Sequence, residues 1–213
     1  MWNELSNIWK EAFSLAWESF KRNTIPIGAV IVNEEGNIIS RGRNRIFDET
    51  SNNPLAGRNM AHAEMTAMIN LKEKEHPNIK KYTLYTTMEP CPMCFGTMVM
   101  MGIRKLRYVA RDGFAGATEL NYNMEYIKSK KILINKEDDE LELFYICLQS
   151  AYEYGRNHKR LEEVLDSWRT YCREGVLLGK QLYDEGYFLE AIKENKYIGQ
   201  IYDEVIHRHK ILK

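Results

Sequence analysis

Three soft metal ligands and one free carboxylate stand in two short segments of this chain. His62 and Glu64 lie two residues apart. Cys91 and Cys94 lie three residues apart, directly after Pro90. Residues three apart on a helix share one face, so both sulfur atoms would point the same way. A helix N-terminus also lowers the pKa of a cysteine, and proline suits a helix entry because its φ is preset. The spacing therefore predicts a metal site formed by His62, Cys91 and Cys94.

The number of ligands indicates what kind of site this is. Three protein ligands leave a tetrahedral zinc ion one open position for water, whose pKa falls from ~16 toward ~7. Glu64 would then move protons instead of holding the metal. The alternative is a closed structural site with a fourth ligand. The candidates for that place are His76, His158, His207 and His209. None stands at ligand spacing from the motif, and we interpret them as surface or capping groups.

The order His-x-Glu followed by Pro-Cys-x-x-Cys is the signature of zinc nucleobase deaminases. The chain resembles the cytidine and deoxycytidylate deaminase superfamily, most closely the branch with tRNA adenosine deaminases, guanine deaminases and small nucleoside deaminases. The resemblance covers residues 25–120. It is carried by Ile27-Gly28-Ala29-Val30, Gly42-Arg43-Asn44-Arg45, Ala61-His62-Ala63-Glu64, Thr87-Met88-Glu89-Pro90-Cys91-Pro92-Met93-Cys94 and Ala110-Arg111-Asp112-Gly113-Phe114-Ala115-Gly116.

The resemblance implies zinc as the cofactor and Glu64 as the catalytic residue. It also implies five substrate-binding residues, Asn44, Ala63, Ile27, Pro90 and Phe114. Asn44 would hydrogen-bond the base or its sugar, although asparagine at a strand end is equally good turn chemistry. Ala63 would lend its backbone N–H to the base, and Ile27 would form an apolar wall. Pro90 would shape the loop that presents Cys91, and Phe114 would stack on the base or fill the core.

The elements that must position these residues follow from apolar periodicity and turn residues. They are a helix over 2–20, strands 25–32 and 38–40, a helix from 61 that stops before 77, a strand over 82–87, a helix through 95–101, and strands 103–110 and 131–135. This order predicts an α/β fold, a three-layer α/β/α sandwich around a mixed five-stranded sheet. The resemblance implies the cytidine deaminase-like arrangement, in which the three ligands project from facing helix N-termini.

The pattern changes after about residue 136. We expect residues 1–135 to form the zinc catalytic domain. Residues 136–213 would form a C-terminal helical extension of two to four helices, packed on the core or on a partner subunit. The family core does not require this extension, and its sequence matches no module that we can assign.

Composition limits the alternatives. Thirty basic and thirty acidic side chains give a net charge of zero, which does not indicate a polyanion partner. Four cysteines are no disulfide framework, and Cys147 and Cys172 are interpreted as buried thiols. Glu4, Glu11 and Glu18 interrupt the apolar positions of the first residues, so we do not expect these residues to form a signal peptide. No apolar run approaches the ~18 residues of a membrane span, and we expect a cytoplasmic protein without membrane partners.

The leading functional hypothesis is zinc-dependent hydrolytic deamination of a free nucleobase or nucleoside, purine or cytosine type, with release of ammonia. The alternative is deamination of adenosine at the wobble position of tRNA. The even charge and the five acidic residues among positions 137–142 make tRNA the less favoured partner. A third hypothesis is a non-catalytic zinc-containing binding or scaffold protein, against which the intact Glu64 argues. The resemblance also implies a homo-oligomer, most simply a dimer.

Overall fold

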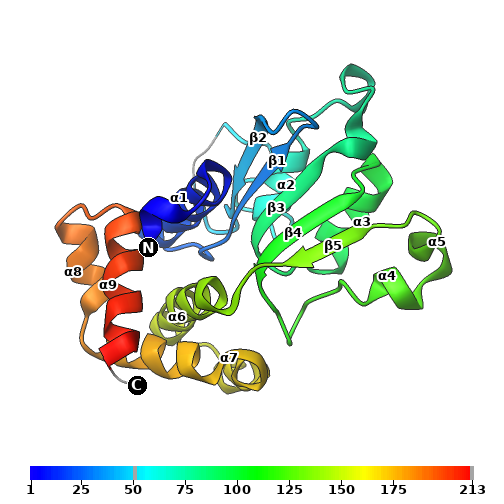
Figure 1. Ribbon diagram of the computed structural model, residues 1–213. Helices are drawn as coiled ribbons and strands as arrows, with labels where there is room; N and C mark the ends of the chain where they lie inside the picture. Colours follow the sequence, from blue (N-terminus) through cyan, green and yellow to red (C-terminus); the bar gives the residue numbers. More distant parts are fainter. Residues whose placement is uncertain (50–51, 212–213) are drawn as a thin grey trace.

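The computed structural model describes residues 1–49 and 52–211 of the 213-residue chain (Figure 1). A five-stranded sheet with the order β2-β1-β3-β4-β5 lies at its centre. β1 is antiparallel to both of its neighbours, whereas β3, β4 and β5 are parallel. The strands are β1 (Gly28–Val32), β2 (Ile38–Arg43), β3 (Thr83–Met88), β4 (Lys105–Ala110) and β5 (Leu133–Lys136). The mixed five-stranded sheet expected from the sequence is confirmed.

Helices cover both faces of this sheet, which confirms the three-layer sandwich (Figure 1). α1 (Asn7–Lys21) and α6 (Asp139–Arg156) pack on one face. α2 (Ala63–Met68) and α3 (Pro92–Met101) pack on the other. Shorter elements complete the first two thirds of the chain: α4 (Leu120–Asn123), α5 (Glu125–Lys128) and the 3-10 turns Trp2–Glu4, Glu73–Glu75 and Ile79–Lys81.

The N-terminal helix begins later than the sequence predicted. A 3-10 turn covers Trp2–Glu4, and Ser6 then caps α1 by accepting a hydrogen bond from the backbone N–H of Trp9. Serine side chains favour this N-cap position because they satisfy an otherwise unpaired backbone donor. The aromatic stripe of α1, with Phe13 and Trp17 fully or nearly buried, lies in the core as expected.

Two other boundaries also differ from the expected ones. α2 spans only Ala63–Met68, because His62 is still extended at φ −64° and ψ 154° and forms the N-cap. β5 begins at Leu133 and not at Lys131, because Lys131 has a φ of +53° and belongs to the turn before the strand. A residue with positive φ cannot continue an extended strand.

The C-terminal extension consists of four helices among the described residues. They are α6 (Asp139–Arg156), α7 (Leu161–Asp184), α8 (Tyr187–Lys193) and α9 (Ile198–Ile211). Their apolar side chains share one hydrophobic core with α1, and the Phe13 and Phe144 rings meet edge-on with centroids 5.5 Å apart. The extension therefore packs on the core of its own chain. A domain boundary after residue 135 stays a prediction. None of the described helices combines the length and the apolar character needed to cross a bilayer.

Candidate active site

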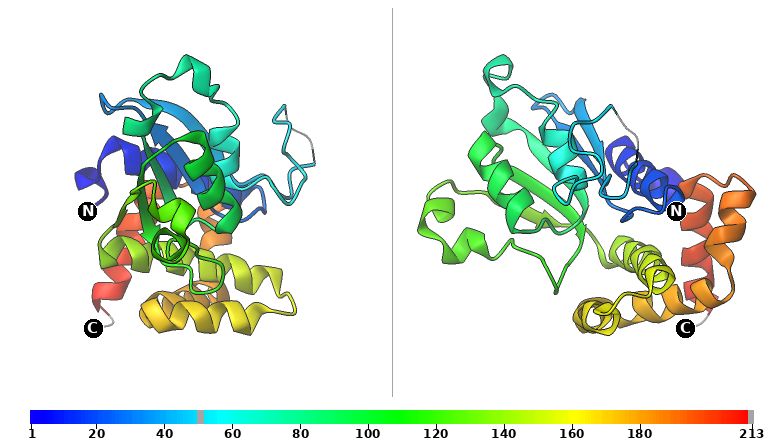
Figure 2. Two further views of the ribbon diagram at one scale, coloured as in Figure 1. Left: turned by 90° about the vertical axis from the view of Figure 1, so that its right-hand side faces the viewer. Right: turned by 180° about the vertical axis from the view of Figure 1, so that it is seen from behind.

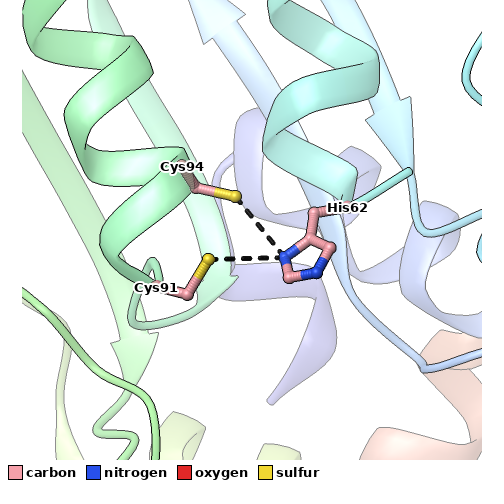
Figure 3. Close-up of side chains that lie close together, drawn as sticks. All are labelled: His62, Cys91 and Cys94. Carbon is pink, nitrogen blue, oxygen red and sulfur yellow. Dashed lines mark hydrogen bonds between the residues drawn. The ribbon is translucent and has the colours of Figure 1, made fainter. Parts of the chain in front are cut away.

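Two helix N-termini bring the predicted metal ligands together (Figure 3). His62 is the residue before α2, Cys91 is the N-cap of α3, and Cys94 lies in the first turn of α3. The Nδ1 atom of His62 is 3.5 Å from the Sγ atom of Cys91 and 3.5 Å from that of Cys94. The expected convergence of these three side chains is thus present.

This spacing fits a zinc ion. One nitrogen and two sulfur atoms lie within 4.8 Å of one another. With bonds of about 2.0 Å to nitrogen and 2.3 Å to sulfur, a tetrahedral zinc ion separates those atoms by about 3.5 Å. Among the described residues the cluster has no fourth ligand, whether histidine, cysteine or carboxylate. The ligand set is therefore that of an open site and not of a closed one.

The proline expected at the start of this helix is Pro92 and not Pro90. Pro92 is the first residue of α3, where a missing N–H costs nothing because no partner exists within the helix. Pro90 lies two residues earlier and is buried, and its carbonyl accepts a hydrogen bond of 3.1 Å from the backbone N–H of Ala117. Pro90 therefore ties the loop before Cys91 to the loop after β4.

Glu64 lies in the first turn of α2 and is 2% exposed. Its Oε1 atom accepts a hydrogen bond of 3.0 Å from the hydroxyl of Thr86 on β3. Its Oε2 atom is buried and has no hydrogen-bond partner among the described residues. Burial raises the pKa of Glu64, since the charged form is poorly solvated there. Thr86 was missed by the sequence analysis, and only its place four residues before Pro90 distinguishes it from other strand threonines.

A cavity of about 250 Å³ opens beside the metal ligands. Its lining residues from the first part of the chain are Ile25, Ile27, His62, Glu64, Met88, Glu89, Cys91, Asp112, Phe114 and Ala115. Two of the five residues expected to bind substrate, Ile27 and Phe114, thus line the cavity together with Glu64. The Phe114 ring is 37% exposed, and the guanidinium of Arg160 lies 4.5 Å from its centroid.

The other three expected binding residues, Asn44, Ala63 and Pro90, are buried and are not part of this lining. Asn44 is fully buried, and its Oδ1 atom accepts hydrogen bonds from the Thr24 hydroxyl at 2.7 Å and the Ile46 backbone N–H at 3.1 Å. These bonds fix the side-chain amide, and its Nδ2 donor has no partner among the described residues. The Asn44 side chain therefore stabilises the turn after β2, and its hydrogen bond to the substrate stays a prediction.

Comparison with known proteins identifies the family to which the chain belongs. The sequence profile of the cytidine and deoxycytidylate deaminase zinc-binding region matches residues 3–110, which is half of the chain. The chain belongs to this family. It is a zinc-dependent deaminase with a histidine and two cysteines as its metal ligands.

The relatives of this deaminase act on different substrates. The tRNA-specific adenosine deaminase of Rickettsia bellii is 36% identical over 123 residues, which cover 57% of this chain and 79% of that protein. The probable cytosine deaminase of Schizosaccharomyces pombe is 34% identical over 127 residues, which cover 58% of this chain and 73% of that one. The chain spans only 17% of a longer relative, the tRNA(Ile)-lysidine synthase of Deinococcus radiodurans, at 36% identity.

Solved structures agree with the fold. A structure from a study of A-to-I editing by tRNA:A34 deaminases at the wobble position has a TM-score of 0.50 and 26% identity. The match covers 61% of this chain and 96% of that one. The match thus takes in nearly all of that protein but leaves part of this chain uncovered.

The electrostatics of the deaminase site favour a bound cation. The hydrogen bond from Cys94 and the contact with His62 lower the pKa of Cys91 to about 4, against the effect of burial. The same hydrogen bond and burial raise the pKa of Cys94. Burial lowers the pKa of His62, but the Cys91 hydrogen bond and the Glu64 charge outweigh it and raise that pKa. A bound metal ion would favour the thiolate form of both cysteines, because coordinated thiols are deprotonated.

The extension also contributes to the cavity, which the sequence analysis did not foresee. Its lining residues from α6, α7 and the segment between them are Gln149, Glu153, Arg156, His158, Val164 and Trp168. His158 accepts a hydrogen bond from the backbone N–H of Arg160 at 3.2 Å, which agrees with a capping role, and its Nε2 atom lies 2.7 Å from Glu153. Helical periodicity shows which face of a helix is apolar, but not which cavity that helix will border.

Proposed function

We propose that this deaminase hydrolyses the exocyclic amine of a free nucleobase or nucleoside, purine or cytosine type, and releases ammonia. The main observation that supports this proposal is the cavity of about 250 Å³, which is bordered on one side by the metal ligands and on another by α6 and α7. Ligand sites of this kind combine apolar walls with a few placed polar groups. Here Ile27, Met88 and Phe114 are apolar walls. Glu64 and Glu89 of the lining each lie two residues from a metal ligand, but both Glu89 oxygens already accept backbone hydrogen bonds. An oxygen without a partner among the described residues remains on Glu64.

In this proposal Glu64 moves the protons of the reaction. Zinc, when bound, would polarise a water molecule and make it acidic enough to ionise near neutral pH. Thr86 holds one oxygen of the Glu64 carboxyl, and the other oxygen is free of protein partners among the described residues. That free oxygen can take a proton from water and deliver it to a ring nitrogen. It can then take the proton of the hydroxyl group newly bonded to the ring carbon and deliver it to the departing amine. The raised pKa of Glu64 supports this role, since a carboxyl that shuttles protons must be able to hold one.

The alternative substrate is adenosine in tRNA. It is supported by the 36% identity to the Rickettsia bellii enzyme, whose name gives this activity. Two features favour the small molecule. The α6 and α7 helices border the cavity, where an anticodon loop would have to enter. The net charge of zero also offers no general attraction for a polyanion.

Ammonia release from adenine, guanine, cytosine, their nucleosides and total tRNA tests the proposal. We expect wild type to act on at least one of the small molecules. We expect Glu64→Gln to lower that activity by about 10²-fold or more, the usual contribution of general acid–base catalysis. The variant should keep its zinc and its melting temperature, because glutamine can still accept the hydrogen bond from Thr86. Activity of wild type on tRNA alone would overturn the proposed substrate class. If the wild-type protein releases no ammonia from any compound of the panel, the result would favour the scaffold hypothesis.

We further propose that the deaminase forms a homodimer, as the resemblance implies. Exposed apolar side chains on α3 and α5 support this assembly. Met100 is 70% exposed and accepts a hydrogen bond of 3.5 Å from the hydroxyl of Tyr126, which is 48% exposed. Light scattering of the purified chain tests the assembly.

A further inference from the structure

The wall that α6 and α7 add to the cavity is held rigidly to the rest of the site. The Trp168 indole donates a hydrogen bond of 3.1 Å to Asp112 in the loop after β4. The neighbouring Arg111 forms two hydrogen bonds, of 2.9 Å and 2.6 Å, to the carboxylate of Glu142 on α6. Its guanidinium also lies 4.7 Å from the ring centroid of Tyr171 on α7. Because both helices are tied to this loop, their side chains keep fixed positions at the cavity.

Gln149 is the residue of this wall with an unused hydrogen-bonding group. It lies on α6, is 2% exposed and lines the cavity. The Tyr145 hydroxyl donates its one proton to the carbonyl of Pro26 at 3.0 Å. It can therefore only accept from Gln149, whose Nε2 atom lies 3.0 Å away. This chain of bonds fixes the amide, so that Nε2 faces Tyr145 and the Oε1 acceptor faces elsewhere.

The Oε1 atom of Gln149 is buried and has no hydrogen-bond partner among the described residues. A buried acceptor without a partner is costly, and native proteins seldom leave one unless a ligand or water pairs with it. Ser150, the next residue on the same helix, is also buried with an unpaired hydroxyl, but it does not line the cavity. Both residues therefore have an unpaired buried polar atom, but only Gln149 borders the cavity.

We propose that Gln149 determines substrate specificity by accepting a hydrogen bond from a ring N–H of the bound base. This inference rests on the proposed deaminase function and narrows it to one substrate class, free nucleobases. Cytosine, adenine and guanine each have a ring N–H at the position where a nucleoside carries its sugar. A nucleoside lacks this donor, so the buried acceptor would stay unpaired in its complex. Sites built around such a hydrogen bond discriminate strongly against analogues that lack it.

The test compares three free bases with their nucleosides in wild type and in Gln149→Leu. Wild type should prefer a base, and Gln149→Leu should lower kcat/KM on that base by about tenfold to hundredfold, because the buried ring N–H of the base would then lack its acceptor. Its activity on the nucleoside should change little. Ser150→Ala is the matched control and should leave both activities unchanged. Melting temperature and zinc content of each variant exclude a general loss of structure.

The possible failures are distinguishable. Wild type that acts on nucleosides in preference to bases overturns the role of Gln149 but leaves the proposed deaminase function intact. Wild type that acts on none of the six compounds overturns both. Should Gln149→Leu not fold, wild type alone is tested with 1-methylcytosine, 9-methyladenine and 9-methylguanine, in which a methyl group replaces the ring N–H. We expect the methylated form of the preferred base to react at least about tenfold more slowly. Equal rates for the two forms would contradict the proposal.

Discussion

At the metal site, the pKa values of two cysteines three residues apart shift in opposite directions, chiefly because of the hydrogen bond between them. Cys91 is half-buried at the N-terminus of α3, whereas Cys94 is fully buried. The spacing of His62, Cys91 and Cys94 could be predicted from the sequence, because a helix turn fixes the direction of i and i+3. The partner of Glu64 could not be predicted, because Thr86 reaches it from a strand 22 residues away.

Removal of one sulfur ligand should abolish tight zinc binding. Cys91→Ala leaves two protein ligands, and we expect zinc affinity to fall by more than about 100-fold, the upper range for losing only an outer hydrogen-bond partner. Cys172→Ala is the matched control, because Cys172 is also half-buried but lies on α7, where burial raises its pKa to about 11. Elemental analysis after dialysis against a chelator measures the difference. Full zinc content in Cys91→Ala would argue against the ligand assignment.

At the scale of elements, the motif-bearing helices could be predicted, but the contacts that place them could not. Apolar periodicity predicts the helix after His62. The close approach of this helix to the sheet, which Gly42 of β2 allows, leaves no such pattern in the sequence. A Cβ atom on Gly42 would lie 2.1 Å from the carbonyl oxygen of Ala63 and 2.4 Å from the backbone nitrogen of Ala67. Periodicity records the apolar face of α2, whereas close backbone approach depends on tertiary packing.

Gly42→Ala should therefore push α2 away from β2 and displace His62. We expect the free energy of unfolding to fall by about 1–3 kcal/mol or more, the cost of overpacking a tight contact. Zinc affinity should fall as well, because the imidazole would leave its place opposite the two sulfur atoms. Gly96→Ala on α3 is the control, since a Cβ atom there has no neighbour within 4 Å and alanine favours a helix. Denaturant unfolding and zinc titration measure both effects. Equal stability of the two variants would show that the close approach of α2 to Gly42 does not contribute to the stability of the fold.

At the scale of the whole molecule, the C-terminal helices lie together on one side, where α9 (red) is next to the N-terminus (Figure 2). The backbone N–H of Trp2 donates to Asp203 on α9 at 2.8 Å, and the Trp17 indole donates to the carbonyl of Lys196 at 3.0 Å. The number of helices in this segment agrees with the sequence, which predicted two to four. Their association with the cavity could not be predicted, because Gln149 lies inside a run of buried residues on α6 and has no motif around it.

The ion pair between Glu142 and Arg111 should make the attachment of this extension depend on pH. Glu142 is 1% exposed, and its carboxylate lies 2.6 Å from Arg111 and 3.0 Å from Lys136. Burial raises the pKa of Glu142, but the hydrogen bonds and charges of these two cations outweigh it and lower that pKa. A lowered pKa in the folded state stabilises the protein above the unfolded value of about 4.3, and this contribution is lost as the pH falls through the folded value.

Glu142→Gln should thus be less stable than wild type at pH 7 by about 1–3 kcal/mol, the range for losing hydrogen bonds to a charged group. The difference should shrink as the pH falls below about 4, because wild type then loses the same charge. Urea unfolding at a series of pH values measures it. Glu163→Gln, whose pair with Arg160 is exposed, is the control and should stay close to wild type in about 1 M salt, where exposed pairs are screened. A stability difference that is independent of pH would mean that Glu142 holds α6 to the loop after β4 by packing, and that its charge contributes nothing.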